Sequence, residues 1–143
     1  MAERLTRTTV VRYAADLADQ SGLDGLSFTK LARSLGVTPP AIYRHLEDIV
    51  DLKRAISALA GDEAAAAVQM ACTGLAGFDA LSALATALRA WALEHPGLYA
   101  AMQTVAPAGE DLVQGEVDSF SQVLRSSLRA YDLEGEEFTH ASR

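Results

Sequence analysis

Hydrophobic positions recur at helical spacing along this chain, and the period-two runs that are typical of strands are absent. Residues 6–20 carry one apolar helical face, and Ser21 and Gly22 end that pattern. A tight connection at 23–26 precedes a second helix at 28–35, with apolar side chains at i, i+3, i+4 and i+7 and Ser27 in position to cap it. The pattern predicts an all-α protein.

The stretch GVTPPAIYRHL, residues 36–46, predicts a glycine turn followed by a short third helix. Thr38 stands at the N-cap, and Pro39 and Pro40 occupy the first turn, where backbone amides have no intrahelical partner. Ile42 and Leu46 are spaced i, i+4 and can anchor the helix on one side. The remaining side chains face outward or flank that anchor. This arrangement is typical of a helix-turn-helix whose second helix enters a DNA groove.

Five further helices and one loop are expected in the rest of the chain. Helices are expected at 48–73, 78–95 and 98–103, then a loop with Pro and Gly at 105–109, a helix at 110–131 and the start of another at 136–143.

Charge divides the chain at about the same place as this change of pattern. Residues 1–54 carry eight Lys/Arg against seven acids, whereas residues 55–143 carry four against twelve, and the total is −7. Only the front segment could lie on phosphates without strong repulsion. We therefore expect a three-helix DNA-binding domain at 1–54 and a helical domain at 55–143.

Several classes of protein are disfavoured by the composition. The first twenty residues hold no apolar signal region, no uncharged apolar run approaches the roughly 20 residues of a membrane span, and Cys72 is the only cysteine, so a cytoplasmic protein without membrane contact is expected. The three histidines are far apart and show no zinc-type spacing, so neither a metal nor another cofactor is expected. Phosphate-binding loops, nucleophile elbows and HExxH helices are missing, which disfavours an enzyme.

Residues 6–54 resemble the N-terminal DNA-binding domain of the tetracycline-repressor (TetR) family of bacterial regulators. The matching features, in the family's order and spacing, are the opening amphipathic helix, Gly25-Leu26-Ser27, Leu31-Ala32, Leu35-Gly36-Val37, the run 42–46 and Asp51-Leu52. The resemblance implies a ligand-responsive transcription regulator, a repressor that binds double-stranded DNA as a homodimer and is released by a small, largely apolar effector.

The resemblance also implies a set of DNA contacts. Pro39, Pro40 and Ala41 hold the positions that usually touch base edges, where apolar groups favour thymine methyls. Arg44 could fork onto a guanine or onto phosphate, and the sequence leaves both open. The residues Thr38, Tyr43 and His45 are implied contacts to backbone phosphates. Further implied DNA contacts, with no partner atom specified, are Arg7, Thr29 and Lys30. One departure is Ile49, because family members often carry a phosphate-binding lysine at the start of the fourth helix.

The phrase LRAWALEHPGLY, residues 88–99, resembles one TetR subclass in which this half of the chain forms an effector cavity and a dimer interface. The candidate lining residues are Trp91, His95, Tyr99, Met102, Phe120 and Leu124. Met and aromatic side chains at helical spacing also suit an ordinary core. TetR proteins normally continue through two more helices that pair across the dimer, so the resemblance implies that the rear domain is incomplete. The alternative from another class is a small-molecule binding protein with a vestigial DNA-binding domain.

Overall fold

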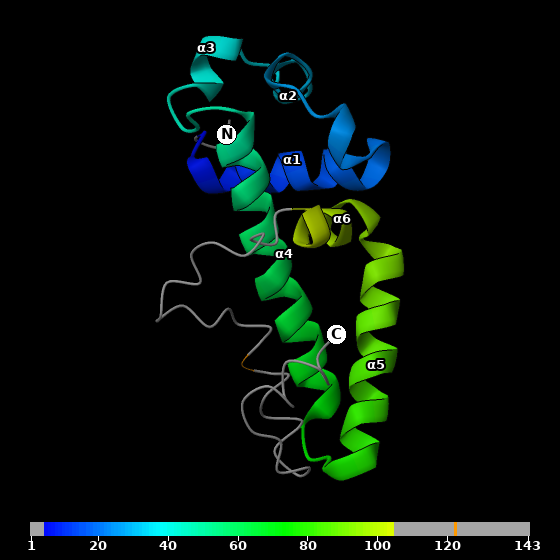
Figure 1. Cartoon of the computed structure of the whole chain (residues 1–143). Helices are drawn as coiled ribbons and strands as arrows, with labels where there is room; N and C mark the ends of the chain where they lie inside the picture. Colours follow the sequence, from blue (N-terminus) through cyan, green and yellow to red (C-terminus); the bar gives the residue numbers. More distant parts are fainter. Residues whose placement is uncertain (1–4, 105–121, 123–143) are drawn as a thin grey trace. The chain divides into compact units, whose positions relative to one another are not determined.

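The computed structural model describes residues 5–104 and residue 122 (Figure 1). The described residues form helices joined by turns and contain no strand, which confirms the all-α prediction for this part of the chain. The elements are α1 (Arg7–Ser21), the short 3-10 helix η1 (Leu23–Gly25), α2 (Phe28–Leu35), α3 (Pro39–Ile42), α4 (Ile49–Cys72), α5 (Gly77–Glu94) and α6 (Pro96–Thr104).

Most helix boundaries lie within a residue or two of those predicted, because local signals set them. Thr6 caps α1 through a reciprocal capping box with Thr9. The third helix is shorter than predicted: regular α-helix ends at Ile42, and turn-type hydrogen bonds continue to Leu46. Helix α6 begins two residues earlier than predicted, since Pro96 suits the first helical position. The loop predicted at 105–109 and the helices predicted at 110–131 and 136–143 lie outside the described residues.

Contacts divide the chain into two compact units, which we describe separately. Of the described residues, the front unit holds 5–60 and 95–104, and the rear unit holds 61–94 and 122. In the front unit α1 contacts α2, η1 and α6, and α2 contacts α3. Helix α6 therefore packs with the segment in which the helix-turn-helix was predicted.

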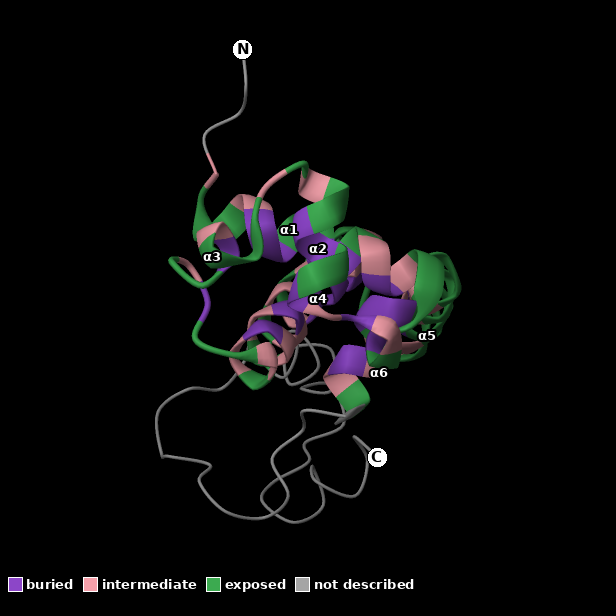
Figure 2. Cartoon of the chain, turned by 90° about the horizontal axis from the view of Figure 1, so that it is seen from above, coloured by how far each residue is buried: buried purple, intermediate pink, exposed green. Residues whose placement is uncertain are grey.

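The core of the front unit is built from the apolar faces that the sequence marks (Figure 2). Its most deeply buried side chains are Val10, Leu31, Ile42, Leu46, Leu52 and Ile56. Burying one such side chain stabilises the fold by about 1.5–3 kcal/mol, so this cluster fixes how α1 to α4 meet. Both predicted anchors of the third helix belong to it.

In the rear unit the described residues are 122 and 61–94, which include the later part of α4 and all of α5. Val68 of α4 is fully buried, and Leu84 and Trp91 of α5 are nearly so, whereas Met70 and Phe78 near the turn are about four-fifths exposed. Gly74 and Gly77 shape that turn with positive φ angles of 78° and 56°. None of the helices that the structure describes has the length and hydropathy needed to cross a bilayer.

Candidate nucleic-acid interface

The turn that presents the third helix is built by two local caps on α2. At its start the Ser27 hydroxyl accepts a hydrogen bond from the Lys30 amide, at 3.3 Å. At its end Gly36 adopts the left-handed conformation, with φ of 66°, and the Val37 amide donates to the Ala32 carbonyl at 2.9 Å. The chain then reverses into α3, as the sequence predicted.

The start of α3 has few free amides, because Pro39 and Pro40 occupy its first two positions. The third amide, of Ala41, donates to the Thr38 carbonyl at 2.9 Å. Thr38 is the N-cap residue, yet its hydroxyl makes no capping hydrogen bond. Thr38 therefore occupies the predicted N-cap position without making the capping hydrogen bond. Its hydroxyl remains available to a partner outside the chain.

One side of the segment 38–46 is buried and the other faces solvent. Ile42 and Leu46 are 0% and 2% exposed, which fixes the segment on the core. Thr38, Pro39, Pro40, Tyr43 and Arg44 are exposed, and Ala41 and His45 are half-buried. We call these seven side chains the recognition face.

Tyr43 combines a packing role with exposure. Its ring meets the Phe28 ring edge-on, with centroids 4.8 Å apart and an interplanar angle of 74°. It nevertheless stays 59% exposed. The contact with Phe28 therefore orients the tyrosine without removing it from the surface.

The other implied DNA contacts lie on the same unit, in different surroundings. Thr29 and Lys30 are exposed in the first turn of α2, and the Lys30 ammonium donates to the Gly25 carbonyl at 2.9 Å. Arg7, at the start of α1, donates to the Asp51 carboxylate through two nitrogens, at 2.6 and 2.9 Å, and to the His45 carbonyl at 2.8 Å. Both cations, Arg7 and Lys30, thus already donate hydrogen bonds to acceptors within the protein.

Asp51 makes side-chain contacts that its place in the sequence motif did not predict. Its hydrogen bonds from Arg7 and from the Glu47 amide lower its pKa from 3.8 to about 2. The same contact with Asp51 raises the pKa of Arg7. The spacing Asp48-x-x-Asp51 at a helix start is the signal that could have identified it, since Asp48 accepts from the Asp51 amide at 2.7 Å.

A second carboxylate, that of Asp19, was also missed. It accepts from the Gly97 and Leu98 amides at 2.7 and 3.0 Å, and its other oxygen lies 3.0 Å from His95 Nδ1. Asp19 therefore caps α6 from α1. His95, predicted to line an effector cavity, takes part in this contact between helices of the front unit.

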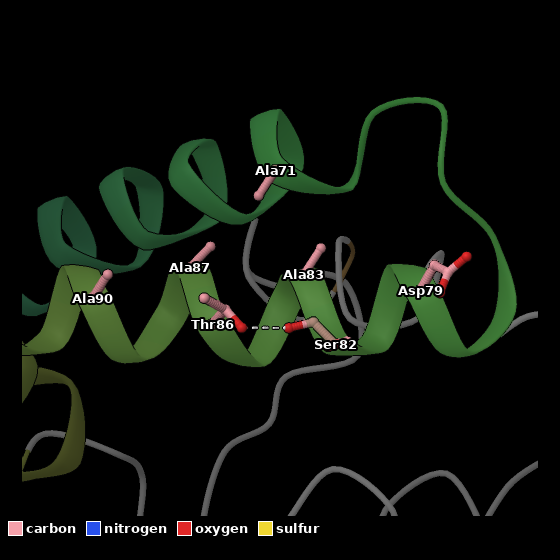
Figure 3. A pocket seen from close by; sticks show the side chains of 7 residues that line it. All are labelled: Ala71, Asp79, Ser82, Ala83, Thr86, Ala87 and Ala90. Atoms are coloured by element: carbon pink, nitrogen blue, oxygen red, sulfur yellow. Dashed lines mark hydrogen bonds between the residues drawn. The ribbon is translucent and has the colours of Figure 1, made fainter.

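The described residues of the rear unit form an open pocket of about 460 Å³ between α4 and α5 (Figure 3). Its lining residues are Ala71, Asp79, Ser82, Ala83, Thr86, Ala87 and Ala90. None of the predicted cavity residues is among them.

Those predicted cavity residues are spread over both units. Trp91 is buried in the rear unit, while His95, half-exposed Tyr99 and half-buried Met102 belong to the front unit. Phe120 and Leu124 lie outside the described residues. The effector cavity thus stays a prediction from the sequence.

A short segment that is anchored by buried side chains, follows a glycine turn and exposes its opposite face defines the helix-turn-helix class of protein. Comparisons with known proteins agree. Residues 81–143 match the family model described as "Tetracyclin repressor-like, C-terminal domain". The chain is 31% identical over 144 residues to the uncharacterized HTH-type transcriptional regulator Rv0681 of Mycobacterium tuberculosis, covering 97% of this chain and 64% of that protein. It belongs to the TetR family.

Other similarities cover different lengths. The HTH-type transcriptional regulator YobS of Bacillus subtilis is 28% identical over 79% of this chain and 60% of its own length, so the chain spans under two thirds of both these relatives. A tetracycline repressor of class A from Escherichia coli is 47% identical over 45 residues, which are 32% of this chain and 21% of that protein. A solved structure described as "a possible TetR family transcriptional regulator" from Streptomyces coelicolor A3(2) superposes with a TM-score of 0.68 at 27% identity, covering 94% of this chain and 63% of that one.

Proposed function

We propose that the protein is a DNA-binding transcription regulator, a repressor that inserts residues 38–46 into the major groove of a palindromic operator. The observation that carries the proposal is the recognition face, which is exposed opposite two fully buried anchors. A homodimer would set two such faces about 34–36 Å apart, one helical turn of DNA. Family membership supports the same function.

Roles within the recognition face follow from its chemistry. Pro39, Pro40 and Ala41 offer no side-chain donors or acceptors, which suits contact with thymine methyl groups. Thr38 and Tyr43 carry hydroxyl groups that suit phosphate oxygens, and His45 and the exposed residues Thr29 and Lys30 could add further backbone contacts. Arg44 is the one arginine of the face and is the residue best suited to a guanine.

The direct test is binding of labelled DNA fragments from both sides of the coding region, followed by fluorescence anisotropy. We expect one fragment to bind more tightly than scrambled DNA. Arg44→Ala should then cost about 1–3 kcal/mol of affinity for that fragment if Arg44 reads a base. An equal loss on scrambled DNA would make Arg44 a phosphate contact. Failure of every fragment to exceed random DNA would favour the small-molecule binding protein instead.

Ile49 offers a gain-of-function test of the docking. It is the first residue of α4, half-buried, where a lysine would add one phosphate contact. Ile49→Lys should tighten binding to the operator and to scrambled DNA alike and steepen the salt dependence by about one unit. A gain confined to the operator would contradict this placement.

We further propose that residues 81–143 bind a small apolar effector that releases the DNA. The support is the match of this segment to the family's C-terminal domain. Such an effector must bind the non-DNA state more tightly, typically by about 1–3 kcal/mol of coupling. Emission of Trp91, which is 7% exposed, gives a separate readout during ligand titration, and a ligand that changes it without lowering DNA affinity would refute the coupling.

A further inference from the structure

The guanidinium of Arg7 is held at the junction of three segments of the front unit. Arg7 lies in the first turn of α1, and both of its terminal nitrogens donate hydrogen bonds to the carboxylate of Asp51, the third residue of α4. One of these nitrogens also donates to the His45 carbonyl, where the recognition face ends. A fork that matches a carboxylate in this way is a geometrically specific contact that a lysine cannot reproduce.

The same carboxylate closes the turn between the recognition face and α4. Asp51 accepts from the Glu47 amide at 3.0 Å, in addition to Arg7. Its own amide donates to Asp48. The backbone is thus held at His45, Glu47 and Asp51 by one guanidinium and two carboxylates, and residues 45–51 form a closed ring with Arg7. We call this set the Arg7–Asp51 clamp.

We propose that Arg7 is a positioning residue, which sets the angle of the recognition face through the Arg7–Asp51 clamp, and that it is not a phosphate contact. The inference rests on the proposed DNA-binding function and assigns a different role to a residue that the family resemblance implied as a DNA contact. A phosphate would have to compete with a carboxylate that already neutralises the guanidinium at 2.6 Å. The carbonyl of His45, one residue after Arg44, would lose its donor if Arg7 turned away.

The two roles predict opposite signs for Asp51→Ala. If Arg7 served phosphates, removal of its competitor would strengthen binding to all DNA. If the clamp positions the recognition face, the same change lowers operator affinity by about tenfold or more, the equivalent of one lost base contact. A rise in affinity would overturn the proposal.

Arg7→Lys separates the roles without removing the charge. The clamp predicts a loss of operator affinity as large as that of Arg7→Ala, with little change on scrambled DNA, so that the ratio of the two affinities falls about tenfold. Near-wild-type binding of Arg7→Lys, or an equal loss on operator and scrambled DNA, would overturn it. The matched control is Arg33→Lys, at an exposed arginine of α2, which should leave the ratio unchanged.

A readout without DNA distinguishes failure of the clamp from failure of the proposed function. In Arg7→Lys the Glu47 amide, which donates to Asp51, should exchange its hydrogen at least about tenfold faster, while the Leu31 amide within α2 stays protected. Unchanged exchange at Glu47 would refute the clamp even if the protein binds DNA. Altered exchange with a wild type that binds no operator would support the clamp and refute the regulator.

Discussion

Helices α4 and α6 both start against α1, but their first turns are held in different ways. At the start of α4 the acceptor is local, since Asp48 takes the amide of Asp51 three residues later. At the start of α6 the acceptor is Asp19, which lies 78 residues before the Gly97 amide that it binds. The chemistry is the same, a carboxylate on the amides of a helix N-terminus.

The difference between a local and a distant cap decides what each helix depends on. A local cap forms together with its own helix, whereas the cap of α6 exists only while α1 is folded and in place. Helix α6 has nine residues, too few to persist alone in water. Helix α6 therefore folds only together with the front unit, which carries the recognition face. A substitution at Asp19 or Gly97 should destabilise both the helix and that unit.

The largest effect is expected for Gly97→Ala. A Cβ atom there would lie 2.2–2.5 Å from backbone atoms of Ala18 and Asp19, which cannot move as a flexible side chain would. We expect a loss of about 2–3 kcal/mol in the free energy of unfolding, measured by denaturant titration with far-UV circular dichroism.

Gly61→Ala is the matched control for that change, because no atom lies within 4 Å of its Cβ position and the residue is inside helix α4. It should stabilise the protein by about 0.5–1 kcal/mol. If both substitutions changed the free energy of unfolding in the same direction, close packing of α6 on α1 would not be what distinguishes the two sites.

Asp19→Ala should have the next largest effect. The Asp19 side chain is only 17% exposed. Its removal leaves the Gly97 and Leu98 amides without their acceptor and takes away a partner of His95. We expect a loss of about 1–3 kcal/mol in the free energy of unfolding, together with faster hydrogen exchange at the Leu98 amide. Asp16→Ala, at an exposed aspartate of the same helix, should change stability by no more than about 0.5 kcal/mol.

The contrast between local and distant contacts also explains how much the sequence could predict. Ser27, Gly36 and the two prolines act within one turn of chain, so their spacing predicted α2, the turn and α3. The anchors Ile42 and Leu46 followed from helical periodicity, and the structure buries both.

Two long-range contacts carried no such pattern. The residues Arg7 and Asp51 are 44 positions apart, and no local rule pairs Asp19 with the start of α6. Resemblance alone therefore makes Arg7 a DNA contact, and only the fold shows its two hydrogen bonds to Asp51. Likewise resemblance places His95 among the cavity residues, although its ring lies beside Asp19.

The Arg7–Asp51 clamp gives a smaller, pH-dependent effect. Because the pKa of Asp51 is lowered from 3.8 to about 2, the stability contributed by its ionised form is fully present above the ordinary value. It is lost as the pH falls from 3.8 towards 2. The difference in unfolding free energy between wild type and Asp51→Asn should be constant from neutral pH down to about pH 5 and shrink below that. A difference that grew on acidification would show that Asp51 is not held ionised by Arg7.

The smallest effect on stability is expected at Thr38, the start of α3, where neither a local nor a distant side chain caps the helix. Because its hydroxyl makes no capping hydrogen bond, Thr38→Ala should change the unfolding free energy by no more than about 0.5 kcal/mol. Ser27→Ala, at a hydroxyl that does cap, should cost about 1 kcal/mol of unfolding free energy.

For DNA affinity the larger effect should be that of Thr38→Ala. This change should weaken binding to all sequences and leave the salt slope unchanged, since a hydroxyl releases no counterion. A stability loss at Thr38 equal to that at Ser27 would instead assign the threonine to folding and remove it from the recognition face.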